Sequence, residues 1–215
     1  MSDELSLSIT GVEPQIEIAG ARRLLLATTR GKIRLILHGV EKAERAVICL
    51  GGATGRLDGP AMLYARLGLE ARTLGLSVMR LGYRVPNDMT ECVLDTMAGL
   101  SFLKGIGHQR VALIGHSFGG GVAIATATLN PMAVAIIAIS SQLDGAHNVA
   151  QLAPRPLLLI HGTADVILPD ASSRMIFERA GEPKTLKLFP GADHGLTQVG
   201  DEVHQLVRQW LTERI

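Results

Sequence analysis

The chain has 215 residues, of which 47% are hydrophobic and 19% are charged, and its formal net charge at pH 7 is +1. A chain of this length and composition is typical of one sizeable globular domain over residues 1–215 and excludes a disordered protein. Since no long run of one charge sign occurs, neither nucleic acid nor an anionic membrane is expected as a partner.

The N-terminal segment and the cysteines bear on the cellular compartment. "MSDELSLSITGVE" is acidic and lacks the basic and apolar regions of a signal peptide. The longest apolar runs, such as "MAVAIIAI", are too short to span a bilayer. Cys49 and Cys92 are too few for a framework of disulfides, and we expect both to be buried or half-buried. These features predict a cytoplasmic protein and leave its oligomeric state open.

The first 45 residues differ in pattern from the rest of the chain. Three apolar stretches with turn residues between them predict consecutive strands within residues 15–20, 23–29 and 32–40. We expect these strands to add a short antiparallel flank to the main sheet.

From residue 46 onward, strand and helix patterns alternate. Short continuous runs of Val, Ile and Leu predict strands buried on both faces. These runs are "AVICL" (46–50), "RVALIG" (110–115), "AVAIIAIS" (133–140) and "PLLLIHG" (156–162). Longer stretches with helical spacing occupy residues 59–75, 86–104 and 201–215. The alternation predicts an α/β protein with a mostly parallel, doubly wound sheet, in which ligands bind at the carboxyl ends of the strands.

Ser117 follows one of these strands directly. Gly115 and Gly119 flank it in "GHSFG", and a run of small residues suited to a tightly packed helix comes next. This arrangement is the Gly-x-Ser-x-Gly nucleophile elbow. A serine nucleophile needs a base and an acid that orients the base, each expected just past a later strand. Asp165 follows "PLLLIHG" and His194 follows the predicted strand "KTLKLF", so both partners occur in the expected order.

Simpler interpretations exist for each of these residues. Ser117 and Asp165 could be ordinary turn residues, and His194 could be a surface histidine. Asp170 is the nearest rival acid, whereas Asp193 is adjacent to His194 and therefore poorly placed to hold its ring. His116 and His161 are expected to shape the loops around the site. The histidines show no metal-ligand spacing, so no metal site is expected.

The motifs "GHSFGG", "HGTADVILP" and "GADHG" resemble those of the α/β-hydrolase superfamily, near its dienelactone-hydrolase-like and small carboxylesterase branch. The resemblance covers residues 46–215 and implies an α/β-hydrolase fold. It implies Ser117 as nucleophile, Asp165 as acid and His194 as base. Two features depart from the family pattern: dienelactone hydrolases proper use a cysteine nucleophile, and the loop "LGGATG" lacks the frequent His-Gly pair.

The tetrahedral intermediate of such a hydrolase needs two fixed N–H donors. Phe118 is expected to supply one, because its amide begins the helix after the elbow. The resemblance places the second at Ala53, with Gly52 as the alternative, and Gly52 is also expected at the substrate. Tyr83 and Phe118 are expected to line the pocket. Arg80 and Arg84 would be either carboxylate-binding groups or solvated surface charges, and the latter is the simpler interpretation.

These residues predict a serine hydrolase that cleaves small carboxylic esters through an acyl-enzyme and needs no cofactor. The alternatives are a thioesterase or acyltransferase with the same triad, or a non-catalytic binding module on a hydrolase scaffold. Only about fifteen residues, "SQLDGAHNVAQLAPR", separate two of the predicted strands at the place where related hydrolases insert a cap domain. We therefore expect no cap, an open and shallow cleft, and no activation at a lipid interface.

Overall fold

The computed structural model describes residues 6–18 and 20–215. In this part of the chain, nine strands form one sheet in the order β1-β2-β3-β5-β4-β6-β7-β8-β9. The strands are β1 (Ile9–Ile18), β2 (Ala21–Thr28), β3 (Gly31–His38), β4 (Arg45–Leu50), β5 (Ser77–Gly82), β6 (Arg110–His116), β7 (Ala133–Ile139), β8 (Leu157–Gly162) and β9 (Lys184–Phe189).

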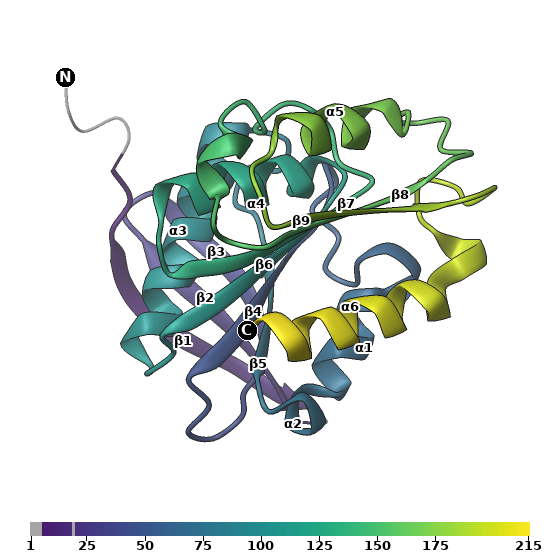
Figure 1. Ribbon diagram of the computed structural model, residues 1–215. Helices are drawn as coiled ribbons and strands as arrows, with labels where there is room; N and C mark the ends of the chain where they lie inside the picture. The colour runs from purple at the N-terminus through teal and green to yellow at the C-terminus, as the bar shows by residue number, and fades with distance from the viewer. Residues whose placement is uncertain (1–5, 19) are drawn as a thin grey trace.

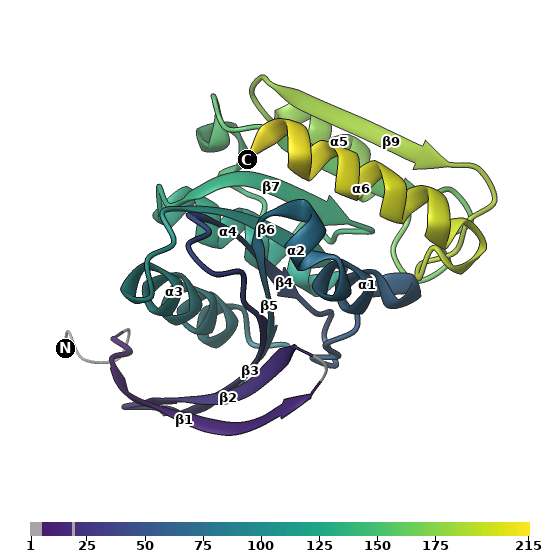
Figure 2. The same ribbon diagram turned by 90° about the horizontal axis from the view of Figure 1, so that it is seen from below.

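The sheet has an antiparallel part and a parallel part, as the sequence pattern predicts. The pairs from β1 through β2 and β3 to β5 are antiparallel. All pairs from β5 through β4 to β9 are parallel. Figure 2 shows the antiparallel strands curving away from the parallel part along one side of the molecule. The parallel part is the one that brings several carboxyl strand ends to one edge.

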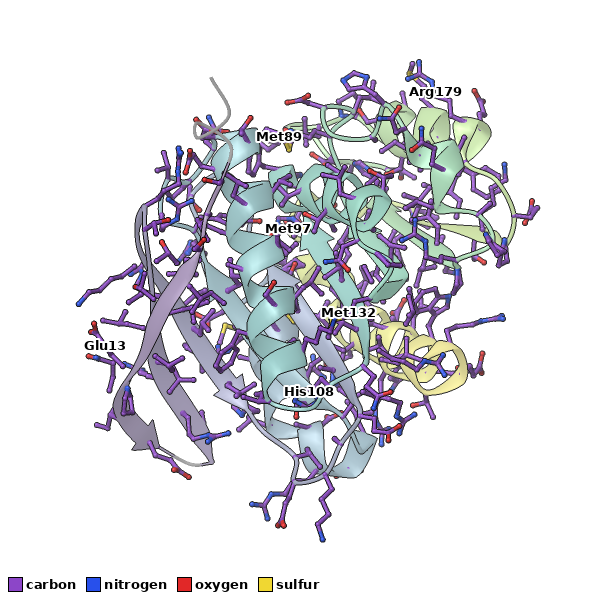
Figure 3. The ribbon with its side chains drawn as sticks, turned by 90° about the vertical axis from the view of Figure 1, so that its left-hand side faces the viewer. Glu13, Met89, Met97, His108, Met132 and Arg179 are labelled. Atoms are coloured by element: carbon purple, nitrogen blue, oxygen red, sulfur yellow. The ribbon has the colours of Figure 1, made fainter. Side chains whose placement is uncertain are left out.

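Helices cover both faces of the parallel part (Figures 1 and 2). One layer contains α3 (Met89–Gly105), α4 (Phe118–Leu129) and α5 (Ala171–Arg179). The other contains α1 (Leu63–Leu69), α2 (Ala71–Leu74) and α6 (Gly200–Arg214). Short 3₁₀ turns occur at η1 (Pro60–Met62), η2 (Val149–Leu152) and η3 (Thr197–Val199). Figure 3 looks onto α3, which begins at Met89 and ends shortly before His108.

The N-terminus of α3 shows how the sequence fixes a boundary. The Asp88 side chain caps the helix by accepting a hydrogen bond of 2.9 Å from the amide of Glu91. The Glu91 carboxylate does not complete a capping box with the Asp88 amide, which donates to the Val85 carbonyl, but binds Arg84 and Arg30. Charge partners from outside the helix therefore take the place of that local contact.

The helix expected over residues 59–75 is broken into η1, α1 and α2. Ala61 and Met62 have φ values of 44° and 60°, so the backbone leaves the right-handed helical region at both residues. Gly75 ends α2 in the left-handed conformation, at φ 64°, as its position in the sequence predicts. The break matters for the site, because the segment before α1 follows the carboxyl end of β4.

The segment between β7 and β8 is short. In residues 140–156, all of which the structure describes, η2 is the single regular element, and it packs against α4. Over the described ranges 6–18 and 20–215, no helix is both long and apolar enough to cross a membrane. Both cysteines are buried and free.

Candidate active site

Ser117 lies at the sharp turn between β6 and α4. Its φ of 58° and ψ of −121° are strained for a residue with a side chain. A Cβ at Gly115 would lie 1.9 Å from the Gly119 carbonyl oxygen, and one at Gly119 would lie 2.4 Å from the Gly51 carbonyl oxygen. The two glycines are therefore needed for the chain to pass this closely. The turn presents Ser117 at the carboxyl edge of the sheet.

The loops after β8 and β9 are joined by backbone hydrogen bonds. The amide of Thr163 donates to the Phe189 carbonyl, and the amide of Ala164 donates to the Ala192 carbonyl, each at 3.0 Å. These bonds bring Asp165 opposite His194. His194 Nδ1 donates to Asp165 Oδ2 at 2.7 Å, which leaves Nε2 of the ring available to face a substrate.

Asp165 is surrounded by hydrogen-bond donors. Its Oδ1 accepts from the amides of Ile167 and Leu168, each at 2.8 Å. Burial by itself raises the pKa of Asp165, but the bonds from the Leu168 amide, His194 and the Ile167 amide outweigh burial and hold that pKa below its usual value. Asp165 is thus kept as a carboxylate beside the imidazole.

The rival carboxylates have other partners. Asp193 accepts hydrogen bonds from the amide and the hydroxyl of Thr197, at 3.1 and 2.8 Å. Asp170 accepts one of 3.0 Å from Arg174. Of the three candidate acids, Asp165 is the one that contacts His194.

Two further histidines support this pair. His161 Nε2 donates to Asp165 Oδ2 at 3.1 Å and to the Leu168 carbonyl at 2.9 Å, while its Nδ1 accepts from the Ser173 hydroxyl at 2.7 Å. His116 Nε2 donates to the backbone carbonyl of His194 at 2.9 Å. Burial lowers the pKa of His116 to about 4, so this ring is neutral near pH 7. The sequence indicated that both histidines shape loops, but it gave no sign of these bonds.

Ser117 and His194 line one open cleft of about 530 Å³, the catalytic cleft. The segment after β4 supplies most of its remaining lining, from Gly51 to Met62, and Gly195 closes it beside His194. In the described part of the chain the Ser117 hydroxyl makes no hydrogen bond with His194. Such a contact is often open in unliganded hydrolases and closes when substrate binds.

The residues expected to stabilise a negative oxygen lie around Ser117. Phe118 is the first residue of α4, so its amide has no acceptor inside the helix. Gly52 and Ala53 both line the cleft, and a Cβ at Gly52 would lie 3.4 Å from Ser117 Cβ. The Gly52 carbonyl accepts from the Gly55 amide at 2.8 Å, so the N–H of Ala53, on the same trans peptide, points the other way.

The expected pocket role of two aromatic side chains is wrong. Tyr83 is only 3% exposed and Phe118 only 4%, and their rings meet edge to face in the core. The Tyr83 hydroxyl donates to the Gly51 carbonyl at 3.3 Å, so this side chain supports the loop from below. Both rings are buried beneath the turn at Ser117 and do not line the catalytic cleft. The Phe118 amide, in contrast, directly follows Ser117, which lines the cleft.

Arg80, in β5, and Arg84, just after it, also differ from their expected roles. Arg84 is buried and bridges Glu91, at 2.7 Å, and the fully buried Asp95. Arg80 forms an ion pair of 2.7 Å with Asp58, a residue that lines the cleft. Both arginines are engaged in ion pairs that organise the loops, so neither is a solvated surface charge.

The sheet order, the two helical layers and the turn at Ser117 define an α/β hydrolase. Residues 63–208 match the model of the Dienelactone hydrolase family, which is more than half of the chain, so the chain belongs to this family. It is similar to the dienelactone hydrolase of Anabaena variabilis, with a TM-score of 0.79 and 19% identity over 94% of this chain and 99% of that one. At this identity the likeness is one of fold.

Two curated relatives are similar in sequence. Uncharacterized protein Rv2307c of Mycobacterium tuberculosis is 27% identical over 199 residues, which cover 78% of this chain and 69% of that protein. Uncharacterized protein YfhR of Escherichia coli is 39% identical over 56 residues, 26% of this chain. In that match the chain spans only 20% of the length of YfhR.

Proposed function

We propose that this hydrolase cleaves small carboxylic esters with a triad of Ser117, His194 and Asp165. One observation carries the proposal: His194 is held by Asp165 through Nδ1, at 2.7 Å, while its ring lines the cleft that contains Ser117. A histidine that has one nitrogen fixed on a carboxylate and lies in the same cleft as a serine supports activation of that serine as a nucleophile.

In the first half of the reaction, His194 Nε2 takes the proton of the Ser117 hydroxyl while Oγ attacks the ester carbonyl. The negative oxygen that forms is stabilised by the amides of Phe118 and Ala53. The imidazolium then gives its proton to the alcohol oxygen as the ester bond breaks. The alcohol leaves, and the acyl group stays on Ser117 as a new ester.

In the second half, His194 takes a proton from water, and the hydroxide attacks the acyl carbonyl. The bond to Ser117 breaks, Oγ regains a proton from His194, and the carboxylic acid departs. Asp165 stabilises the imidazolium in both halves, which is consistent with a carboxylate whose pKa is held low.

Two features favour small esters. The catalytic cleft is open and measures about 530 Å³, and the segment between β7 and β8 contributes no helix that could cover it. Each additional methylene that such a cleft buries is worth about 0.8 kcal/mol, and this gain ends once the cleft is filled. A lactone is a cyclic ester, so the family to which the chain belongs supports ester chemistry.

Labelling with a fluorophosphonate probe, followed by peptide mapping, tests the proposal. We expect one label, on Ser117, in the wild-type protein and in the matched variant Ser101→Ala, whose serine is exposed on α3. The label should be lost in His194→Ala. A folded wild-type protein that stays unlabelled, or is labelled elsewhere, would contradict the proposed triad.

A parallel assay with 4-nitrophenyl acetate and the matched thioester separates the reaction classes. We expect the oxygen ester to be hydrolysed to acetate. Exclusive cleavage of the thioester, or exclusive transfer to an added alcohol or thiol, would assign the same serine to a thioesterase or an acyltransferase.

A further inference from the structure

A second, smaller cleft of about 360 Å³ adjoins the catalytic cleft. Ala61 lines both. We call the second cleft the polar trough, because most of its lining residues are polar or charged: Arg66, Thr197, Gln198, Asp201 and Glu202, beside Ala61, Val199 and Gly200. Its residues come from α1 and from the segment that leads into α6, and Figure 1 shows these two helices side by side.

The two clefts differ in chemical character. The catalytic cleft is lined mainly by apolar groups and backbone, including Ala53, Pro60 and Met62. The polar trough is lined mainly by groups that donate or accept hydrogen bonds. A ligand that extends across Ala61 would therefore place an apolar part on one side and a polar part on the other.

Several groups of the polar trough are held in place by the protein. Arg66 forms an ion pair of 2.8 Å with Asp201. The Gln198 side-chain carbonyl accepts from the Asp193 amide at 3.1 Å, which leaves its NH₂ group to donate elsewhere. Glu202 is exposed in the first turn of α6. This set offers both donors and acceptors, the combination that recognises several hydroxyl groups at once.

The position of His194 decides which half of an ester enters the polar trough. His194 must protonate the leaving alcohol oxygen, so the alcohol lies on the histidine side of the reacting carbon. The trough residues 197–202 belong to the segment that follows His194 and Gly195, the two residues of this loop that line the catalytic cleft. Ala61 forms the border, since it packs so closely on Gly200 that a Cβ there would come within 2.8 Å of Ala61 Cβ.

We infer that the polar trough is the subsite for the alcohol part of the substrate and that this alcohol is polyhydroxylated, as in a monosaccharide. The inference rests on the proposed function, because it takes His194 as the proton donor to the leaving group. The acyl part occupies the apolar catalytic cleft. The substrate class is thus a short acyl ester of a sugar or a similar polyol.

A matched pair of substrates tests this inference. 6-O-acetylglucose and hexyl acetate carry the same acyl group on a primary alcohol of six carbons, so their intrinsic reactivity is similar. We expect kcat/KM, measured by acetate release, to be about tenfold or more higher for the sugar ester. A tenfold ratio corresponds to one or two hydrogen bonds of ordinary strength.

Variants of the polar trough give the sharper comparison. Gln198→Leu and Glu202→Leu should each lower kcat/KM for 6-O-acetylglucose about tenfold more than they lower kcat/KM for hexyl acetate, mainly by raising KM for the sugar ester. Gln205→Leu is the matched control, because Gln205 is exposed on α6 outside the trough. It should change neither substrate, and thermal melting should show that all three variants are folded.

The outcomes separate the inference from the proposed function. Equal kcat/KM for the two esters, or a response of the trough variants no larger than that of Gln205→Leu, would overturn the polar trough as the alcohol subsite. The proposed function would still stand if Ser117 were labelled and 4-nitrophenyl acetate were cleaved. An unlabelled Ser117 with no cleavage of any ester would contradict both.

Discussion

The two walls of the catalytic cleft are held in different ways. We call residues 162–168 and 189–195 the acid–base wall, of which His194 and Gly195 line the cleft. Backbone hydrogen bonds join its two loops, and Asp165 accepts hydrogen bonds from His161 and His194. The oxyanion wall consists of residues 51–62. It is held at its start, where the Tyr64 and Tyr83 hydroxyls donate to the carbonyls of Leu50 and Gly51, and again at Asp58, which pairs with Arg80.

The backbone differs between the walls as well. Four residues of the oxyanion wall have positive φ, namely Gly55, Gly59, Ala61 and Met62. In the acid–base wall, Gly191 is the single residue with positive φ. On the proposed mechanism, we expect the acid and base to be preorganised by their hydrogen bonds and the oxyanion wall to be the part that adjusts to a substrate. Changes to the first wall should therefore affect catalysis more strongly than changes to the second.

Ser117 lies between the walls, and its loss should have the largest effect. Ser117→Ala should lower kcat for 4-nitrophenyl acetate by about 10⁴- to 10⁶-fold, because no acyl-enzyme can form. The change removes one hydroxyl that makes no hydrogen bond among the described residues, so the melting temperature should change little. A folded Ser117→Ala protein with near wild-type activity would refute the assignment.

The acid–base wall is tested by exchanging each carboxylate for its amide. Asp165→Asn should lower kcat about 10³- to 10⁴-fold, since His194 Nδ1 loses its carboxylate partner. Asp170→Asn and Asp193→Asn are the matched controls, because their carboxylates bind Arg174 and Thr197. Both should keep most of the activity. If Asp193→Asn lowered kcat more than the other two variants did, Asp165 would not be the acid of the proposed triad.

His116 donates a hydrogen bond to the acid–base wall at the His194 carbonyl, and its protonation should weaken the fold in acid. The pKa of His116 is lowered to about 4 by burial, below the 6.5 of a free histidine. Between these values the unfolded chain binds more protons, so stability falls as the pH drops from 6.5 toward 4. At pH 5 the loss is about 2 kcal/mol relative to neutral pH.

Urea unfolding at pH 5 and pH 7.5 measures this loss. His116→Gln keeps a donor for the His194 carbonyl and cannot titrate, so its drop in stability between the two pH values should be smaller by about that amount. His38, His108 and His204 also have lowered pKa values, caused mainly by burial, so part of the drop remains in the variant. An identical drop in the variant and the wild type would exclude His116 as a contributor.

Tyr83→Phe tests the oxyanion wall and should have the smallest effect. The variant loses one hydrogen bond of 3.3 Å to Gly51 but keeps the buried ring. We expect a loss of about 1 kcal/mol in the free energy of unfolding and less than a tenfold change in kcat. A loss of activity as large as that of Asp165→Asn would mean that the oxyanion wall is as rigidly specified as the acid–base wall.

The sequence by itself determined the strand ends at which the candidate catalytic residues lie. Ser117, Asp165 and His194 each follow a short apolar run, and the glycines around Ser117 encode the sharp turn locally. Each of these patterns lies within about ten residues, so it can be recognised without knowledge of the rest of the fold. Asp88 at the start of α3 and Gly75 at the end of α2 were predictable for the same reason.

Only the tertiary structure decided what surrounds those residues. Tyr83 follows β5, and the order β5-β4-β6 places it beneath the loop after β4, where its ring is covered. The hydrogen bond of His116 joins it to a residue 78 positions later in the chain. The hydrogen bond of His161 joins it to Asp165, in the loop that follows its own strand. The polar trough likewise forms only when α1 meets the beginning of α6. Burial and pairing across the sheet depend on which elements become neighbours, and a local sequence pattern does not contain that information.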